Sequence, residues 1–131
     1  MGIGIKLKVI NLDDGDGFIH FEISISNEQT KTEFEFYNYD DAFKVFGEKL
    51  CGFPTKTTDR IDFQIGEEDR KWTYYLFLEV YCYEPNGQSV IKVIVDNHGS
   101  EPYYERNEFS IRTLPAPLNK FGQGLKHGIQ I

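Results

Sequence analysis

The sequence predicts a single α+β domain, 1–131, in which an antiparallel sheet of about six or seven strands packs against two helices. Three observations support this fold class. Apolar and polar residues alternate along several short segments, two other segments carry apolar residues at helical spacing, and the second half of the chain repeats the pattern of the first. The 131 residues are 40% hydrophobic and 15% aromatic, which is enough for one core without disulfide or metal crosslinks.

Three strands are expected in the first half of the chain. Residues 3–10 and 18–26 both alternate apolar with polar side chains, and the turn LDDGDG between them predicts a hairpin. Residues 33–37 alternate in the same way and predict a third strand.

A helix is expected to follow the third strand. Asn38 is the expected N-cap, and acidic residues in the first turn would favour a helix that runs to about Leu50. Gly52 and Pro54 mark its end. The apolar residues that would share one face of this helix are Phe43, Phe46 and Leu50.

The second half of the chain predicts strands at 60–65, 72–83, 90–95 and 107–113. The segment 72–83 is apolar on both faces, so it is expected to lie inside the sheet. The segment LPAPLNKFGQGL, with proline near its start and glycine near its end, predicts a second helix.

An internal repeat links the two halves, 1–54 and 60–127, as two β-β-β-α units. A shift of 75 residues places 33–50 on 108–125 without a gap, and a shift of 70 places 17–27 on 87–97. The identical positions under the first shift are Glu33 and Glu108, Phe34 and Phe109, Phe46 and Phe121, Gly47 and Gly122, and Leu50 and Leu125. We therefore predict the same strand-to-helix geometry in both halves; chance similarity between two amphipathic segments is the alternative.

Gly47 and Gly122 recur inside the predicted helices, where glycine costs about 1 kcal/mol relative to alanine. Both lie at the edge of the apolar stripe formed by Phe46 and Leu50, and by Phe121 and Leu125. We interpret them as structural positions, at which each helix packs closely on the sheet or the two helices pack on one another.

The composition excludes several classes of function. The net charge is −7, which argues against a nucleic-acid binder, because such proteins need a surplus of Lys and Arg against phosphates. The longest apolar run is far too short to cross a membrane. The first residues, MGIGIKLKV, do not resemble a secretory signal, so we expect a cytoplasmic protein.

No motif predicts an enzyme, a cofactor or a metal centre. The sequence lacks GxSxG, P-loop and GxGxxG patterns, and its three histidines have no metal-binding spacing. Cys51 and Cys82 are too few and too far apart for a disulfide framework, and we expect both to be buried thiols.

Tyrosines interleaved with carboxylates are the remaining candidates for a functional surface. Exposed aromatic rings anchor protein interfaces, and carboxylates steer a basic partner towards them. The alternative is that most of these rings pack in the core or along the sheet edge. The residues predicted to contact a partner are Glu67, Glu68, Asp69, Tyr81, Tyr83, Glu84, Glu101, Tyr103, Tyr104 and Glu105.

The short, acidic, aromatic-rich chain with helices of the FGEKL and FGQGL kind resembles the immunity proteins of bacterial polymorphic toxin systems. That resemblance implies a stoichiometric inhibitor of a secreted toxin domain, often a basic nuclease. Such an inhibitor presents carboxylates where the phosphates of the substrate would lie. The resemblance assigns no binding role to individual residues of this chain.

Two other functions are open at this stage. The first is a small-ligand or carbohydrate-binding module, in which Trp72 and the tyrosines of 72–83 line a concave face. The second is a homodimer formed through the aromatic outer face of the same strand, and the protein is thus expected to be a monomer or a homodimer.

Overall fold

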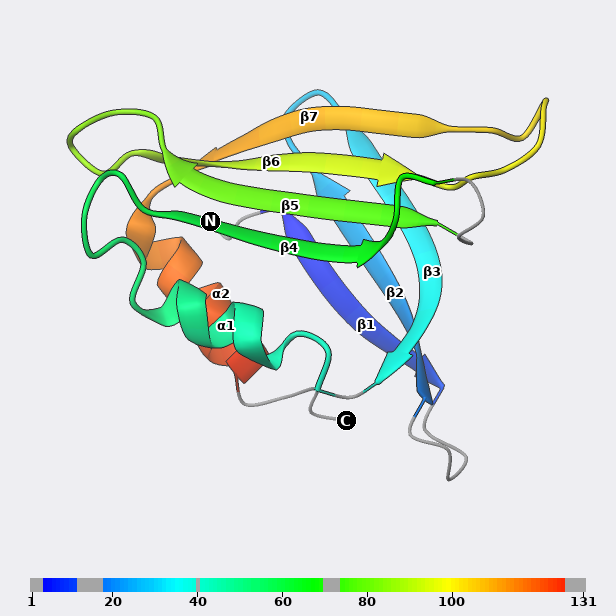
Figure 1. Cartoon of the computed structure of the whole chain (residues 1–131), viewed down its shortest axis with the longest axis horizontal. Coiled ribbons are helices and arrows are strands. Elements are labelled where there is room, and N and C mark those ends of the chain that lie inside the picture. The colour runs from blue at the N-terminus through cyan, green and yellow to red at the C-terminus, as the bar shows by residue number, and fades with distance from the viewer. Residues whose placement is uncertain (1–3, 12–17, 40, 70–73, 127–131) are drawn as a thin grey trace.

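The computed structural model describes residues 4–11, 18–39, 41–69 and 74–126, and Figure 1 shows its seven strands and two helices. The expected LDDGDG turn and Trp72 lie outside these residues. The elements, in chain order, are β1 (Ile5–Asn11), β2 (Phe18–Ser26), β3 (Lys31–Tyr39), α1 (Lys44–Cys51), β4 (Arg60–Gly66), β5 (Tyr75–Cys82), β6 (Ser89–Asp96), β7 (Arg106–Thr113) and α2 (Pro115–Lys126). The α+β class and the number of elements are as predicted.

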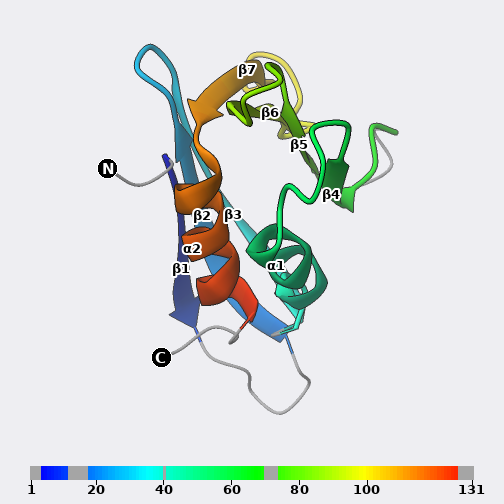
Figure 2. The ribbon, with the colours of Figure 1, turned by 90° about the vertical axis from the view of Figure 1, so that its left-hand side faces the viewer.

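The strands form two antiparallel sheets rather than one. Sheet A has the order β1-β2-β3, and sheet B has the order β4-β5-β6-β7. Strand β5, which is apolar on both faces, pairs with β4 on one side and β6 on the other, so its predicted interior position is confirmed. Figure 2 shows the two sheets at an angle, with α1 and α2 side by side in the space where the sheets diverge.

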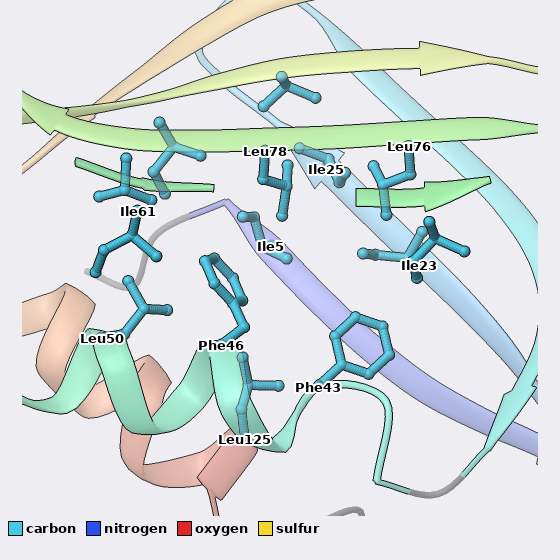
Figure 3. Packing of buried hydrophobic residues seen from close by; sticks show 14 of the residues in the cluster. Ile5, Ile23, Ile25, Phe43, Phe46, Leu50, Ile61, Leu76, Leu78 and Leu125 are labelled. Atoms are coloured by element: carbon cyan, nitrogen blue, oxygen red, sulfur yellow. The ribbon is translucent and has the colours of Figure 1, made fainter. Parts of the chain in front are cut away.

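The core lies between the sheets and the helices. Apolar residues from both sheets and both helices form one buried cluster. In Figure 3 the side chains of Phe43, Phe46 and Leu50 point from the α1 region towards the strands, with Leu125 of α2 beside them. The rings of Phe43 and Phe46 stack on Phe63 of β4 at centroid distances of 4.9 and 5.0 Å, and these contacts attach α1 to sheet B.

Helix α1 begins later than the sequence predicts. Asn38 still belongs to β3, where its Oδ1 accepts a hydrogen bond from the amide of Tyr39, so Asn38 does not cap the helix. The pairing of Tyr39 with Phe18 extends β3, and a turn then precedes the N-cap at Phe43. Cross-strand pairing therefore overrides the local capping signal.

The predicted repeat extends to the strand register. Shifting β2 by 70 residues and β3 by 75 gives the register of β6 with β7, residue for residue. The matched core pairs are Phe21 with Phe36 and Ile91 with Ile111, and Ile23 with Phe34 and Val93 with Phe109. A shift of 71 residues likewise places β1 on β5 up to the bulge after Val9. The halves thus match as three strands and a helix, whereas β4 has no counterpart among the described residues.

Equivalent residues of the two halves meet where the halves pack together. Thr32 and Asn107 are 75 residues apart, and the Nδ2 of Asn107 donates a hydrogen bond of 3.4 Å to the Oγ1 of Thr32. A residue of one half thus contacts its own equivalent in the other half, as residues beside the two-fold axis of a symmetric dimer do.

Gly47 and Gly122 lie where α1 packs against α2. A methyl group added at Gly47 would lie 2.7 Å from the Cβ of Leu125 and 2.9 Å from the Gly122 carbonyl oxygen. A methyl group at Gly122 would lie 2.7 Å from the Cβ of Leu50 and 2.8 Å from the Gly47 carbonyl oxygen. Of the two expected arrangements, helix against helix is the one observed.

We predict opposite effects of alanine at two glycines of α2. Gly122→Ala forces the helices apart and should lower the free energy of unfolding by about 1–3 kcal/mol. Gly124→Ala meets no atom within 4 Å and should raise it by about 0.5–1 kcal/mol, because alanine favours a helix. Urea unfolding of the two variants and the parent measures both effects. A shift in the same direction for both variants would contradict the close helix contact.

Candidate functional site

The predicted contact residues divide between the two ends of sheet B. Tyr81, Tyr83 and Glu84 lie where β5 ends, whereas Tyr103 and its neighbours lie in the connection from β6 to β7, at the opposite end (Figure 1). The eight residues of β5, at about 3.3 Å each, separate the two ends by roughly 25 Å. The ten residues therefore do not form one surface.

Seven of the ten residues lie together at one end of sheet B. The register places the end of β4 beside the start of β5, the end of β6 and the start of β7. We name this surface the acidic end, and it comprises Glu67, Glu68, Asp69, Glu101, Tyr103, Tyr104 and Glu105. All of these residues are exposed except Tyr104, which is partly buried.

The loop of the acidic end is built on a turn that also occurs in the first half. In the turn after β2, the Oδ1 of Asn27 accepts hydrogen bonds from the amides of Gln29 and Thr30 at 2.8 and 2.7 Å. After β6, the Oδ1 of Asn97 accepts them from Gly99 and Glu105 at 2.9 and 3.0 Å.

These donors occupy equivalent positions, since Gln29 corresponds to Gly99 and Thr30 to Glu105. The backbone amide of each asparagine also donates a hydrogen bond to the carbonyl oxygen of the last turn residue. The distance is 2.9 Å from Asn27 to Thr30 and 3.1 Å from Asn97 to Glu105.

The second turn contains five additional residues. Four residues, 27–30, join β2 to β3, whereas nine, 97–105, join β6 to β7. The additional segment is SEPYY, 100–104, between the two amides that Asn97 binds. It supplies Glu101, Tyr103 and Tyr104, and therefore three of the seven residues of the acidic end.

The additional segment is held in place by polar contacts. The Nδ2 of Asn97 donates to the Tyr103 carbonyl oxygen at 3.0 Å, and the Tyr103 amide donates to the Ser100 carbonyl oxygen at 2.7 Å. Tyr103 thus has an anchored backbone, while its side chain is 80% exposed, the highest value among the large apolar and aromatic residues described. Its neighbour Tyr104 turns inward and donates from its hydroxyl to the Oδ2 of Asp96 at 3.0 Å.

Asp96 is the buried anchor of this loop, with 4% of its surface exposed. Its carboxylate accepts hydrogen bonds from the His98 amide at 2.9 Å and from the Nη1 of Arg106 at 3.1 Å, in addition to Tyr104. Burial alone raises the pKa of Asp96. The hydrogen bonds from the His98 amide, Arg106 and Tyr104 outweigh burial and hold the pKa below its ordinary value.

Arg106 connects the loop to Glu68 of the acidic end and to Glu108 of β7. Its Nε donates to Glu108 at 3.0 Å and its Nη2 to Glu68 at 3.1 Å, while Nη1 binds Asp96. The hydrogen bonds to Glu108 and Glu68 are the main reasons that its pKa lies above the usual range. One guanidinium therefore fixes carboxylates from three segments.

The opposite end of sheet B offers less exposed aromatic surface. Tyr81 is partly covered by Arg60, whose guanidinium carbon lies 4.4 Å from the ring centroid. Tyr83 is 42% exposed, and its hydroxyl donates to Gln88. On the outer face of β5, Tyr75 is buried, so this face presents few free rings to a second copy of the chain.

An exposed aromatic cluster on sheet A was missed by sequence reasoning. Phe18 stacks on Tyr39, and His20 on Tyr37, each at a centroid distance of 4.5 Å. The Nε2 of His20 also lies 2.8 Å from Glu35. The sequence does show aromatic residues at outward positions of the segments that form β2 and β3. Which of these rings lie opposite one another depends on the register of the two strands, which the sequence pattern does not give.

A groove lies between β3 and β4, each of which is an edge strand of its sheet. Its volume is about 480 Å³. The rings of Tyr37, Phe63 and Tyr74 line it together with the amides of Asn38 and Gln64. Burial raises the pKa of Tyr74 to about 12, so its hydroxyl stays protonated.

The remaining candidate chemistry is limited within the described residues. Cys51 and Cys82 are free thiols and are partly rather than fully buried, because both lie near the ends of their elements. The described residues contain no group of three or more His, Cys, Asp or Glu side chains placed to hold a metal ion. None of the helices in this part of the chain is long and apolar enough to cross a bilayer.

No protein-family model, curated protein or solved structure matches the chain. Function must therefore be inferred from the geometry of the acidic end and the groove.

We predict that Asp96→Asn weakens the fold in a pH-dependent way. A carboxylate whose folded pKa lies below its unfolded value stabilises the fold above about pH 4, and this stabilisation is lost as the pH falls through the folded pKa. The variant should lose about 1–3 kcal/mol at pH 7 and much less near pH 2. Urea unfolding across this range measures the difference. Asp62→Asn, at an exposed position of β4, should stay within about 0.5 kcal/mol of the parent at pH 7, and a constant loss for Asp96→Asn at every pH would contradict the assignment.

Proposed function

We propose that this protein binds a basic protein partner through the acidic end of sheet B and inhibits it, as an immunity protein inhibits its toxin. The observation that carries the proposal is the segment 100–104, which is added to a turn that the first half builds without it. The fold of the hairpin does not need this segment, because 27–30 close the equivalent hairpin with four residues.

Preorganisation supports the role of Tyr103 as an anchor. Ordering a loop on binding costs free energy, and a loop already fixed by hydrogen bonds avoids most of that cost. The side chain of Asn97 fixes three backbone groups of this loop, and Asp96 holds Tyr104. Tyr103 can therefore bury a large ring in a partner with little loss of backbone freedom.

The carboxylates support a basic partner. Glu101 and Glu105 belong to the loop, Glu67, Glu68 and Asp69 follow β4 at the same end of sheet B, and the whole chain has a net charge of −7. Such a surface accelerates encounter with a positively charged protein and disfavours partners of like charge. A nuclease active site, which binds phosphates with Lys and Arg, would accept these carboxylates in place of its substrate and would be blocked sterically.

Deletion of residues 100–104 should separate binding from folding. Joining Gly99 to Glu105 recreates the four-residue turn of the first half, so we expect a stability close to that of the parent in urea unfolding. The deletion should abolish protection in a growth assay in which the reading frame beside this one is induced with and without the protein. Tyr83→Ala, at the opposite end of sheet B, should retain protection.

The same assay can overturn the proposal. Loss of protection in Tyr83→Ala, or full protection by the folded deletion variant, would move the interface away from the acidic end. With a purified partner, the association rate should fall as salt rises, because the Debye length shortens to about 8 Å at physiological ionic strength. A rate independent of salt would exclude steering by the carboxylates.

A small-ligand module is the second candidate, favoured by the groove between β3 and β4. Its volume of about 480 Å³ and its mixture of rings and amides suit a sugar or another small polar molecule with an apolar face. Trp72 precedes Tyr74 by two residues in the sequence, so a ligand in the groove should change the fluorescence of this single tryptophan. A saccharide screen that changes the fluorescence of the parent but not of Tyr37→Ala would support this function. A screen without any change would oppose it.

A further inference from the structure

The duplicated register identifies a strand position in sheet A that no described residue occupies. In sheet B, β5 pairs with β4 on one side and β6 on the other. Its counterpart β1 pairs only with β2, and no other described strand adjoins it. Figure 2 shows β1 at the left margin of the molecule, on the far side of sheet A from β3.

The burial of the matched residues differs as expected for a strand that has no neighbour on that side among the described residues. Leu78 and Val80 face Phe63 and Ile61 of β4, and only 2% and 0% of their surface is exposed. Their counterparts in β1 are only partly buried, although β2 pairs with β1 in the same register as β6 pairs with β5. These counterparts are Leu7 and Val9. An added strand would bury them as β4 buries β5.

The outward face of β1 determines which strand can be added. Lys6 and Lys8 alternate with the core residues and are exposed. Cross-strand neighbours of opposite charge are favourable, and like charges are unfavourable. A second copy pairing antiparallel through its own β1 would place lysines beside lysines, so these residues oppose self-association while they admit an acidic strand.

We propose that β1 accepts an extended segment of a partner protein, antiparallel to β1, in which apolar residues alternate with acidic ones. Strand β4, which pairs with the counterpart of β1, shows which side chains such a segment needs. Strand β4 places Ile61, Phe63 and Ile65 towards the core, and Asp62 lies opposite Glu79, the counterpart of Lys8. The incoming strand needs three apolar side chains opposite Ile5, Leu7 and Val9 and carboxylates opposite the two lysines. This site is separate from the acidic end, which belongs to sheet B.

A synthetic peptide with the sequence of residues 59–67, DRIDFQIGE, and Glu in place of Gln64 provides the probe. Its fluorescently labelled form should bind the full chain with saturation at concentrations up to about 1 mM. A double variant with Lys6→Glu and Lys8→Glu, at two exposed positions, should bind this peptide at least tenfold more weakly. A peptide carrying Lys at positions 62 and 64 should show the reverse preference for the two proteins.

Three controls keep this test decisive. Urea unfolding establishes that the double variant is folded. In NMR spectra of the isotope-labelled protein, the backbone amide signals shifted by the peptide should belong to β1. Shifts in β5 would mean that the peptide replaces β4, and this result would overturn the proposal. Absence of saturable binding, equal binding to both proteins, or a parent dimer that the double variant loses in light scattering also overturns it.

Discussion

The close contact between α1 and α2 is the constraint on which the rest of the structure depends. Gly47 and Gly122 bring the two helix backbones together, since a methyl group at either would lie within 3 Å of the other helix. With the helices this close, Leu50 and Leu125 both reach the common core. The two helices therefore pack as one unit in the space where the two sheets diverge (Figure 2).

The duplication also provides an internal comparison that a single sequence otherwise lacks. A feature present in both halves serves the fold that both share, as the Asn27 and Asn97 turns do. A feature present in one half at an equivalent position is not required for that fold. The segment 100–104 and strand β4 both occur only in the second half, but they lead to different inferences. The first is an addition that projects outward, and the second marks a position next to β1 at which sheet A has no described strand.

Periodicity predicted the strands closely because alternation reports which side chains face the core. It did not separate the two sheets, since alternation says nothing about which strand edges pair. The expected cap at Asn38 was wrong because pairing of Tyr39 with Phe18 continued β3. The tyrosines were predicted as one surface, yet consecutive hairpin turns lie at opposite ends of a sheet, so the connectivity already separated Tyr83 from Tyr103. The aromatic cluster around Tyr37 needed the register, which local patterns do not supply.

The arginine at the start of β7 explains how the added segment is held. Lys31 binds Glu33 at 2.9 Å in the first half, and at the equivalent positions Arg106 binds Glu108 at 3.0 Å. The pair itself therefore belongs to the shared fold. Only the second half has arginine, whose fork can bind several carboxylates in a fixed geometry as lysine cannot. Asp96, which binds this fork and Tyr104 together, stands where the first half has the partly exposed Ser26. Because loop and anchor occur together and neither is needed to close the hairpin, they form one unit that positions Tyr103 at the acidic end.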